Sequence, residues 1–153
     1  MNTICYVAGK SGGHIIPALT HAAQELKKNG ETRVIFFSTN SPLDYTLLAK
    51  NSLIAHHIPL EFCAIPRKNI LLWPLFFIIL FKHFYHSFSC LRKYRPEKVV
   101  SMGGFVSIPV CCCAWVLRIP IELYELNVVP GKAVKLLSHI VTETRICFEN
   151  RRR

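Results

Sequence analysis

Two glycine-rich turns carry the residue types best suited to chemistry in this chain. Residues 9–14 (GKSGGH) follow an apolar run at residues 4–8, and residues 102–107 (MGGFVS) follow a pair of valines at residues 99–100. Each pattern predicts a strand that ends in glycines and leads into a helix, which leaves bare backbone N–H groups at the helix N-terminus. Such groups hold anions, so the two turns predict a site for a diphosphate or for two parts of one ligand.

The first turn contains a Gly-Lys-Ser triplet at residues 9–11, as nucleoside triphosphatases do. Their phosphate loop also needs a glycine five positions before the last one, and Ile4 stands there, which excludes that class. The Gly12-Gly13 pair still permits close approach of a phosphate, and a plain strand–helix turn is the alternative. Because histidines exchange protons near neutral pH, His14 is a candidate general base or phosphate donor, or else a polar surface residue.

These turns need a sheet to position them, and the chain alternates strand-like and helix-like segments. We predict strands at residues 3–8, 33–38, 54–60, 98–102, 119–124 and 139–142, and helices at residues 15–29, 43–51, 70–93, 107–117 and 130–137. The alternation predicts an α/β protein with a Rossmann-like parallel sheet and flanking helices. Ligands bind such sheets at the carboxyl ends of the strands, so residues 9–14, 103–107 and 125–131 should form one site.

The composition narrows the class of partner. With 19 Lys and Arg against 9 Asp and Glu, the formal charge is +10, which suits phosphates, nucleic acid or an anionic membrane surface. Motifs for nucleic-acid recognition are missing, so we expect no nucleic-acid partner. The 7 cysteines show no paired CxxC spacing. That pattern is typical of reduced thiols that pack as small apolar groups, and we expect no metal site.

The segment at residues 70–93 is the most apolar part of the chain. Residues 70–81 carry no charge, and a helix that is apolar all round is buried in protein or in lipid. The uncharged run is shorter than the roughly 20 residues that span a bilayer, and Pro74 should interrupt it early. Basic residues on both sides favour an interfacial helix in anionic lipid, with core burial, a subunit contact or a marginal span as alternatives. The flanking basic residues are Arg67, Lys68, Arg92, Lys93 and Arg95, and the predicted membrane contacts are Leu72, Trp73, Phe76, Phe77, Leu80 and Lys82.

Three motifs together resemble the MurG family of N-acetylglucosaminyltransferases, glycosyltransferase family 28. Residues 9–19 (GKSGGHIIPAL) resemble its first glycine loop, and residues 95–109 (RPEKVVSMGGFVSIP) resemble its second. Residues 119–127 (IPIELYELN), followed by Pro130-Gly131, are similar to its His-Glu-Gln-Asn segment. The three occur in the family's order and cover nearly the whole chain, but only the amino-terminal half of the family.

The resemblance implies a fold and a reaction. These enzymes have two Rossmann-like domains that face each other across a cleft, the GT-B arrangement. They move N-acetylglucosamine from UDP-GlcNAc to an undecaprenyl-diphosphate-linked muramyl-pentapeptide in peptidoglycan synthesis, with inversion and without a bound metal or other cofactor. The amino-terminal domain receives this lipid-linked acceptor, and the protein lies peripherally on the cytoplasmic face of the bacterial inner membrane. Carried over by position, His14 and Glu125 would be catalytic, Asn127 would contact the sugar, and Ser11, Gly12, Gly13, Gly103 and Gly104 would hold the acceptor diphosphate.

The chain departs from the family pattern in places. Lys10 and Ser11 stand where the family usually has Gly-Thr, Tyr124 stands where it has His, and Leu126 where it has Gln. No sequence like the donor-binding domain follows, so we expect residues 1–153 to form one acceptor-binding domain that binds UDP-GlcNAc only with a donor domain and is inactive alone. One alternative is a non-catalytic membrane-anchor subunit that recruits a separate donor-binding chain, and another is an unrelated α/β binding module.

Overall fold

The computed structural model describes residues 2–9, 11–49, 51–61, 70–127 and 131–146. Their strands form one parallel sheet in the order β3-β2-β1-β4-β5-β6. The strands are β1 (Thr3–Val7), β2 (Arg33–Thr39), β3 (His56–Leu60), β4 (Lys98–Ser101), β5 (Ile121–Glu125) and β6 (Glu143–Ile146). The order reverses between β1 and β4, so ligands are expected at the carboxyl ends of these two strands.

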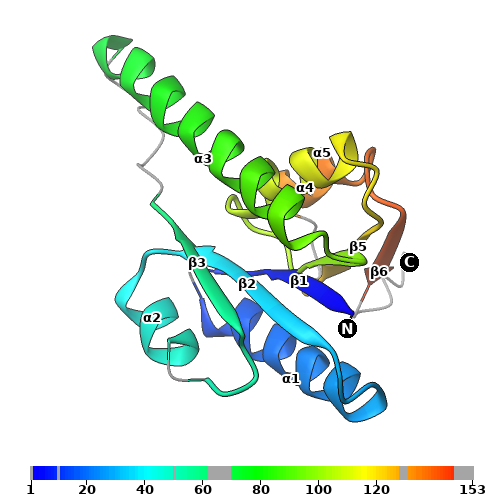
Figure 1. The fold of residues 1–153 in the computed structure, drawn as a ribbon. Helices are drawn as coiled ribbons and strands as arrows, with labels where there is room; N and C mark the ends of the chain where they lie inside the picture. Colours follow the sequence, from blue (N-terminus) through cyan, green and yellow to red (C-terminus); the bar gives the residue numbers. More distant parts are fainter. Residues whose placement is uncertain (1, 10, 50, 62–69, 128–130, 147–153) are drawn as a thin grey trace, which may run out of the picture.

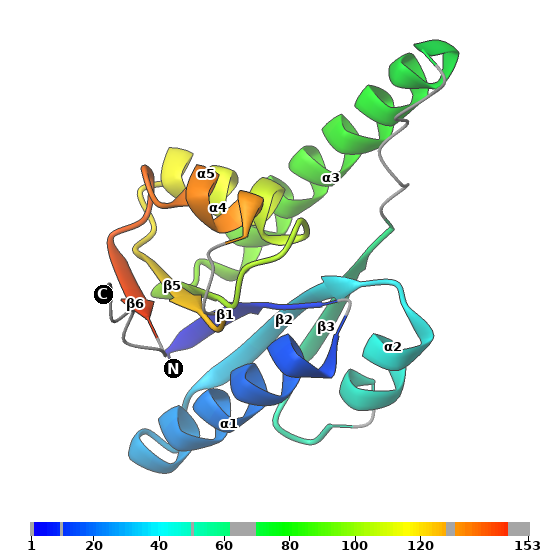
Figure 2. The ribbon, with the colours of Figure 1, turned by 180° about the vertical axis from the view of Figure 1, so that it is seen from behind.

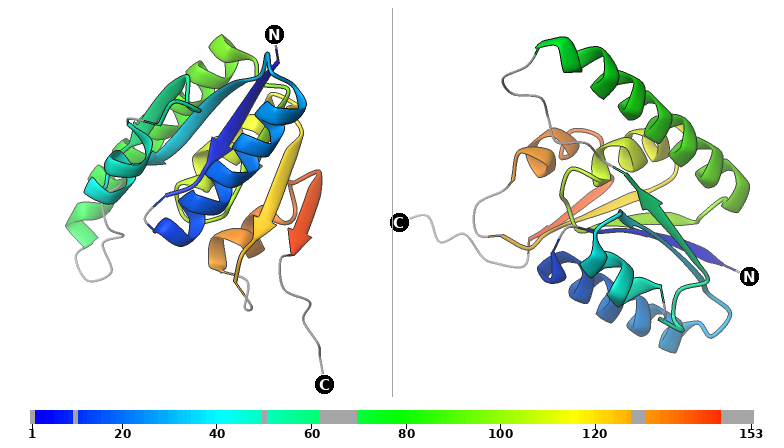
Figure 3. Two further views of the ribbon diagram at one scale, coloured as in Figure 1. Left: turned by 90° about the horizontal axis from the view of Figure 1, so that it is seen from below. Right: turned by 90° about the vertical axis from the view of Figure 1, so that its left-hand side faces the viewer.

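Helices cover both faces of the sheet (Figures 1 and 2). On one face lie α1 (Gly12–Lys28) and α2 (Pro42–Leu48), and on the other lie α3 (Trp73–Tyr94), α4 (Ser107–Val116) and α5 (Lys132–Leu137). Figure 3 shows the two helical layers on either side of the strands. This is the Rossmann-like α/β arrangement that the alternating sequence pattern predicts, and the predicted fold class is confirmed.

The central strands β1 and β2 read as nearly continuous apolar runs because both of their faces are buried. In β2, every residue from Val34 to Phe37 is buried. Alternate residues enter two separate cores. Phe37 and Leu123 belong to the core beneath α3, α4 and α5, whereas Phe36 belongs to the core beneath α1 and α2.

Two predicted boundaries differ from the structure. Helix α1 begins at Gly12 rather than at residue 15, because Ser11 is extended and its carbonyl accepts the first helical hydrogen bonds. The last strand lies at Glu143–Ile146 rather than at residues 139–142. After α5 the chain makes a further turn. Pairing with β5 begins at Thr142, whose N–H donates to the carbonyl of Ile121.

One half of helix α3 packs against the protein core, and the other half projects away from it. Its first half stands clear of the other elements on the side where the strands end, and its second half packs against α4 (Figure 1). Pro74 lies in its first turn, where the missing N–H has no helical partner to lose, so the expected interruption does not occur. In the part of the chain that the structure describes, α3 is the helix long and apolar enough to cross a membrane, judged by length and composition alone.

Candidate functional site

The predicted loops meet at one edge of the sheet. Strands β1 and β4 pair directly, with Val7 opposite Ser101. The N–H of Met102 donates to the carbonyl of Val7 at 2.9 Å, and the N–H of Ala8 donates to that of Phe37 at 3.1 Å. Because paired strands lie about 5 Å apart, the loops that follow β1 and β4 are neighbours, and the loop after β5 comes next.

The first loop presents the open N-terminus of α1. The carbonyl of Ser11 accepts the N–H groups of His14 at 3.1 Å and Ile15 at 3.3 Å, but the Ser11 side chain makes no capping bond. Among the described residues, the N–H groups of Gly12 and Gly13 have no protein acceptor, and the first turn holds no acidic side chain. The positive end of the helix dipole is therefore available to an anion.

The second loop turns sharply before α4. Gly103 and Gly104 have φ values of +79° and +85°, a left-handed backbone that favours glycine. The N–H of Gly103 donates to Oγ of Ser101 at 3.2 Å, and its carbonyl accepts from Oγ of Ser107 at 2.7 Å. Gly103 is therefore bound within its own loop, whereas the N–H of Gly104 has no acceptor among the described residues.

Two glycines are required by packing. A Cβ at Gly9 would lie 2.7 Å from the backbone N of Thr39 and 2.9 Å from Oδ2 of Asp44. A Cβ at Gly103 would lie 3.0 Å from Cγ2 of Val134 on α5. These positions let β1 approach β2, and the second loop approach α5, more closely than a side chain would allow.

Three other glycines face open space. The nearest atom to a Cβ at Gly12 would be Cδ1 of Ile16 at 3.6 Å, and at Gly13 it would be Oγ of Ser11 at 3.8 Å. A Cβ at Gly104 would meet nothing within 4 Å. Packing within the chain demands none of these three glycines. The positive φ of Gly104 already accounts for a glycine there, so close approach of a ligand is the better explanation at Gly12 and Gly13.

The packing role of Gly9 gives a direct test. We expect Gly9→Ala to destabilise the fold by about 2–3 kcal/mol, since the backbone of Thr39 cannot yield as a flexible side chain would. Gly30→Ala is the matched control, because a Cβ there meets nothing within 4 Å. Urea unfolding of the two variants measures the difference, and equal midpoints would contradict this assignment.

The structure places His14 in the first turn of α1, beside Gly12 and Gly13. Its ring is partly buried, and its Nδ1 atom is buried without a hydrogen-bond partner among the described residues. A buried polar atom normally has a partner, so this nitrogen is a candidate contact for a ligand hydroxyl or phosphate.

The structure buries Glu125 and uses its carboxylate locally. The side chain is 2% exposed. Its Oε1 accepts from the N–H and Nδ2 of Asn127 at 2.8 and 3.0 Å, and its Oε2 accepts from the N–H of Gly131 at 3.4 Å. The carboxylate thus shapes the loop after β5 and holds the amide of Asn127. A catalytic role for Glu125 stays a prediction, and this geometry favours a positioning role.

Sequence reasoning missed Asp44, which is fully buried at the start of α2. It accepts hydrogen bonds from Oγ1 of Thr39 and, at 2.6 Å, from Oγ of Ser41, while its own N–H donates to Oγ of Ser41 at 3.1 Å. The carboxylate packs against Gly9 and so supports the first loop from beneath. The signal was present, because Ser41-Pro-Leu-Asp44 has the spacing of a helix capping box.

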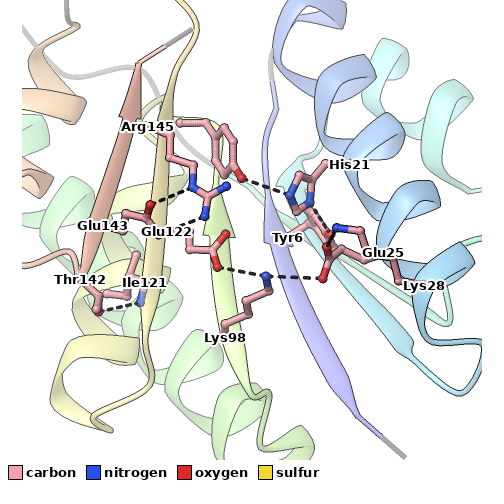
Figure 4. A network of polar contacts seen from close by, with 11 residues as sticks. Tyr6, His21, Glu25, Lys28, Lys98, Ile121, Glu122, Thr142, Glu143 and Arg145 are labelled. Carbon is pink, nitrogen blue, oxygen red and sulfur yellow. Dashed lines mark hydrogen bonds and ion pairs between the residues drawn. The ribbon is translucent and has the colours of Figure 1, made fainter.

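A second missed feature links α1 to two strands (Figure 4). The ring of His21 bonds to the hydroxyl of Tyr6 through Nδ1 at 2.9 Å and to that of Tyr124 through Nε2 at 3.1 Å. Burial lowers the pKa of the His21 imidazole. Burial also raises the pKa of the Tyr6 hydroxyl, with the nearby Glu25 adding to the effect. At neutral pH this bridge therefore consists of uncharged rings.

Beside this bridge lies an ion-pair chain. Nζ of Lys98 on β4 lies 3.5 Å from Oε2 of Glu25 on α1 and 3.0 Å from Oε1 of Glu122 on β5 (Figure 4). Burial alone would lower the pKa of Lys98, but the hydrogen bond and charge of Glu122 outweigh burial and raise it. The Lys98 side chain therefore stays protonated between α1 and β5.

The predicted membrane contacts lie on the projecting half of α3 and the turn before it. Of these, Leu72, Trp73, Phe77 and Lys82 are exposed, and Phe76 and Leu80 are half-buried. Further exposed apolar residues that the sequence reasoning did not single out are Leu71, Leu75, Ile78, Phe81 and Tyr85. The exposed surface is thus larger than predicted, and 73% of Phe81 is accessible.

The basic residues do not all surround this apolar surface. Arg92 and Lys93 lie in the last turn of α3, about 22 Å along the helix from Phe77. Arg67, Lys68 and the Lys10 of the first loop lie outside the described residues. In the described chain, Arg92 and Lys93 therefore lie at the far end of α3, as predicted, and the residues predicted to flank the near end lie outside the described ranges.

Comparison with known proteins places the chain in a family. The glycosyltransferase family 28 N-terminal domain matches residues 4–146. A UDP-N-acetylglucosamine–N-acetylmuramyl-(pentapeptide) pyrophosphoryl-undecaprenol N-acetylglucosamine transferase of Treponema denticola is 32% identical over 155 residues, covering 97% of this chain and 39% of the relative. A protein of the same description from Bacillus thuringiensis subsp. konkukian is 33% identical over 144 residues, covering 92% of this chain and 38% of the relative. The chain thus spans about two fifths of the length of these relatives.

Solved structures share the fold. MurG of Acinetobacter baumannii superposes with a TM-score of 0.81 at 22% identity, covering all of this chain and 43% of that one. A UDP-GlcNAc 2-epimerase from Neisseria meningitidis, bound to UDP-GlcNAc, gives a TM-score of 0.67 at 12% identity, covering 97% of this chain and 40% of that one. The predicted resemblance is confirmed: the chain belongs to glycosyltransferase family 28 and corresponds to the N-terminal domain of that family.

Proposed function

We propose that this chain is the acceptor-binding half of a family 28 N-acetylglucosaminyltransferase in peptidoglycan synthesis, and that it holds a lipid-linked diphosphate at its two glycine loops. One observation carries the proposal: the N–H groups of Gly12 and Gly13 at the start of α1, and of Gly104 in the neighbouring turn before α4, have no acceptor among the described residues. The names of the relatives support it, since the Treponema denticola protein is described as transferring N-acetylglucosamine to a pyrophosphoryl-undecaprenol acceptor.

In this proposal the backbone binds the diphosphate. The N–H groups of Gly12, Gly13 and Gly104 donate to its oxygens, and the positive ends of α1 and α4 favour its charge. Neither helix has an acidic residue in its first turn to oppose this. The acceptor is thereby fixed with its sugar hydroxyl over the loops.

The transfer is a direct displacement at the anomeric carbon of UDP-GlcNAc. The acceptor hydroxyl oxygen forms the new bond, the bond to the UDP oxygen breaks with inversion, and the hydroxyl proton goes to a base. The partly exposed ring of His14 is the proposed acceptor of that proton. This chain binds UDP-GlcNAc only in combination with a donor-binding domain. The proposed steps use no metal ion or other cofactor.

The projecting half of α3 supports a peripheral position on the membrane, at its cytoplasmic face. From Trp73 to Phe81 this half is about 14 Å long, roughly half the hydrocarbon thickness of a bilayer. The second half is committed to the protein core through His83, Ser87 and Leu91. We therefore favour insertion into one leaflet over a transmembrane span.

The diphosphate site is tested by titration with a farnesyl diphosphate whose distal phosphate carries a methyl ester. We expect saturable binding, with the largest amide NMR shifts at Gly12, Gly13 and Gly104. Farnesol and inorganic diphosphate, used separately, report the contributions of tail and headgroup. Binding with no shift at these three amides would overturn the site.

Catalysis is tested separately. We expect the 153-residue chain to transfer no sugar to a lipid-linked muramyl-pentapeptide, and to do so only when a family 28 donor-binding domain is added. Robust turnover by the chain alone would contradict this. In the reconstituted mixture, His14→Gln should lower turnover at least about 100-fold if His14 is the base.

The His14→Gln variant also distinguishes the proposed catalytic function from the alternative function. The exposed apolar half of α3 equally suits a non-catalytic membrane anchor that recruits a separate donor-binding chain. In that case the reconstituted His14→Gln variant turns over like the unaltered chain, and the bound partner supplies the base.

A further inference from the structure

His21 lies where α1 crosses the sheet, and its ring joins three elements. It bonds to Tyr6 of β1 and Tyr124 of β5, and the ring centroids of His21 and Tyr124 are 5.3 Å apart in an edge-on contact. Because residues seven apart share one face of a helix, His21 lies on the same stripe of α1 as His14. Tyr124 directly precedes Glu125, whose carboxylate shapes the loop after β5.

We propose that His21 is a positioning residue that acts as a pH-dependent latch: its neutral ring holds the first turn of α1 and the Glu125 loop in register for diphosphate binding, and its protonation releases them. The proposal rests on the proposed function. It adds a regulated contact about two helical turns away from the ligand.

The hydrogen-bond inventory explains the latch. A neutral imidazole has one donor and one acceptor, so it satisfies two hydroxyls, one that accepts and one that donates. A protonated imidazole has two donors and no acceptor, so the tyrosine that donated to the ring must turn its O–H to another acceptor. Tyr6 is fully buried and stacked on Phe36, whereas Tyr124 is half-exposed at the end of β5. Tyr124 is therefore the ring that shifts, and the shift reaches Glu125 through the backbone.

The charges around His21 shift its pKa in opposite directions, so burial determines the direction of the net shift. Two glutamates favour the protonated ring and two lysines disfavour it, while burial has the largest effect and lowers the pKa. The groups that face the ring, besides the two tyrosines, are Glu25 and Lys28 of α1, Lys98 of β4 and Glu122 of β5. A lowered pKa means that the latch is closed at neutral pH and opens as the pH falls below the ordinary range of histidine.

The test compares dissociation constants for the methyl-esterified farnesyl diphosphate at about pH 7.5 and about pH 5.5. Both phosphates of this diester stay ionised over that range, so the probe itself does not titrate. The unaltered chain should bind roughly twofold to fivefold more weakly at the lower pH, because a ring with a lowered pKa is only partly protonated there. His21→Gln keeps one donor and one acceptor but takes up no proton, so it should bind normally at neutral pH and lose this dependence. Equal pH dependence in both proteins would overturn the latch.

A second variant keeps the test decisive if His21→Gln fails to fold. Tyr124→Phe removes the hydroxyl that shifts, so it should bind about threefold to tenfold more weakly at neutral pH and show a flat pH profile. Tyr94→Phe, at the last residue of α3, is the matched control and should behave like the unaltered chain. An unaltered pH profile in Tyr124→Phe overturns the latch alone, whereas failure of the unaltered chain to bind at either pH overturns the proposed function and the latch together.

Discussion

Gly13→Val is expected to weaken binding of the methyl-esterified farnesyl diphosphate by about 10- to 100-fold without unfolding the protein, because the new methyl groups stand over N–H groups that make charged hydrogen bonds. The unliganded chain has room for the change, since the nearest atom to a Cβ is Oγ of Ser11 at 3.8 Å. Isothermal titration measures the affinity, and thermal unfolding followed by circular dichroism measures the stability.

Two control variants test whether the effect is specific to Gly13→Val. Gly30→Val places the same side chain in open space beyond the other end of α1 and should leave affinity unchanged. Gly13→Ala should fall between the unaltered chain and Gly13→Val in affinity, while gaining about 0.5 kcal/mol of stability from the lower entropy of its unfolded state. If Gly13→Val binds like the unaltered chain, the start of α1 does not hold the diphosphate.

The double variant Phe77→Glu/Phe81→Glu is expected to bind lipid vesicles at least about 100-fold more weakly, because two aromatic side chains that enter the apolar layer become charged. These rings are 46% and 73% exposed, so the free energy of unfolding should change little. Sedimentation with phosphatidylglycerol–phosphatidylcholine vesicles measures binding, and urea unfolding checks the fold.

The matched control is Leu136→Glu, which introduces the same charge at a leucine that is 58% exposed on α5. Its vesicle binding should stay normal, because α5 lies away from the projecting half of α3 (Figure 1). Loss of folding in the double variant would place the first half of α3 in a protein core. Normal vesicle binding would remove the membrane role from this helix.

The alternation of strand-like and helix-like segments predicted the parallel sheet, because helices cover both of its faces and its central strands β1 and β2 are largely apolar. It also predicted which loops meet, since carboxyl ends of parallel strands share one edge. It could not separate packing glycines from open ones. Gly9 is required by Asp44, 35 positions away along the chain, and Gly103 by Val134, and such contacts leave no local trace in a glycine-rich turn.

The roles of side chains were harder to predict than their positions. Glu125 follows an apolar strand and reads as a free carboxylate at the site, yet backbone N–H groups of its own loop occupy it. The partners of His21 lie 15 and 103 positions away, so no short motif reveals the bridge. The apolar run at residues 70–81 is compatible with burial in protein or in lipid, and only the tertiary structure shows that the first half of α3 is bare and the second half is packed.

Helix α3 runs unbroken from the protein core to its apolar end. In the proposed membrane-bound state it acts as a spacer of set length, because the depth to which Trp73 and its neighbours enter the lipid determines how high the two glycine loops stand above the lipid surface. Each residue added between the two halves would lift the loops by about 1.5 Å and turn the apolar face by about 100°. On this proposal, the number of residues in one helix sets how far an isoprenoid-linked headgroup must reach to meet the loops.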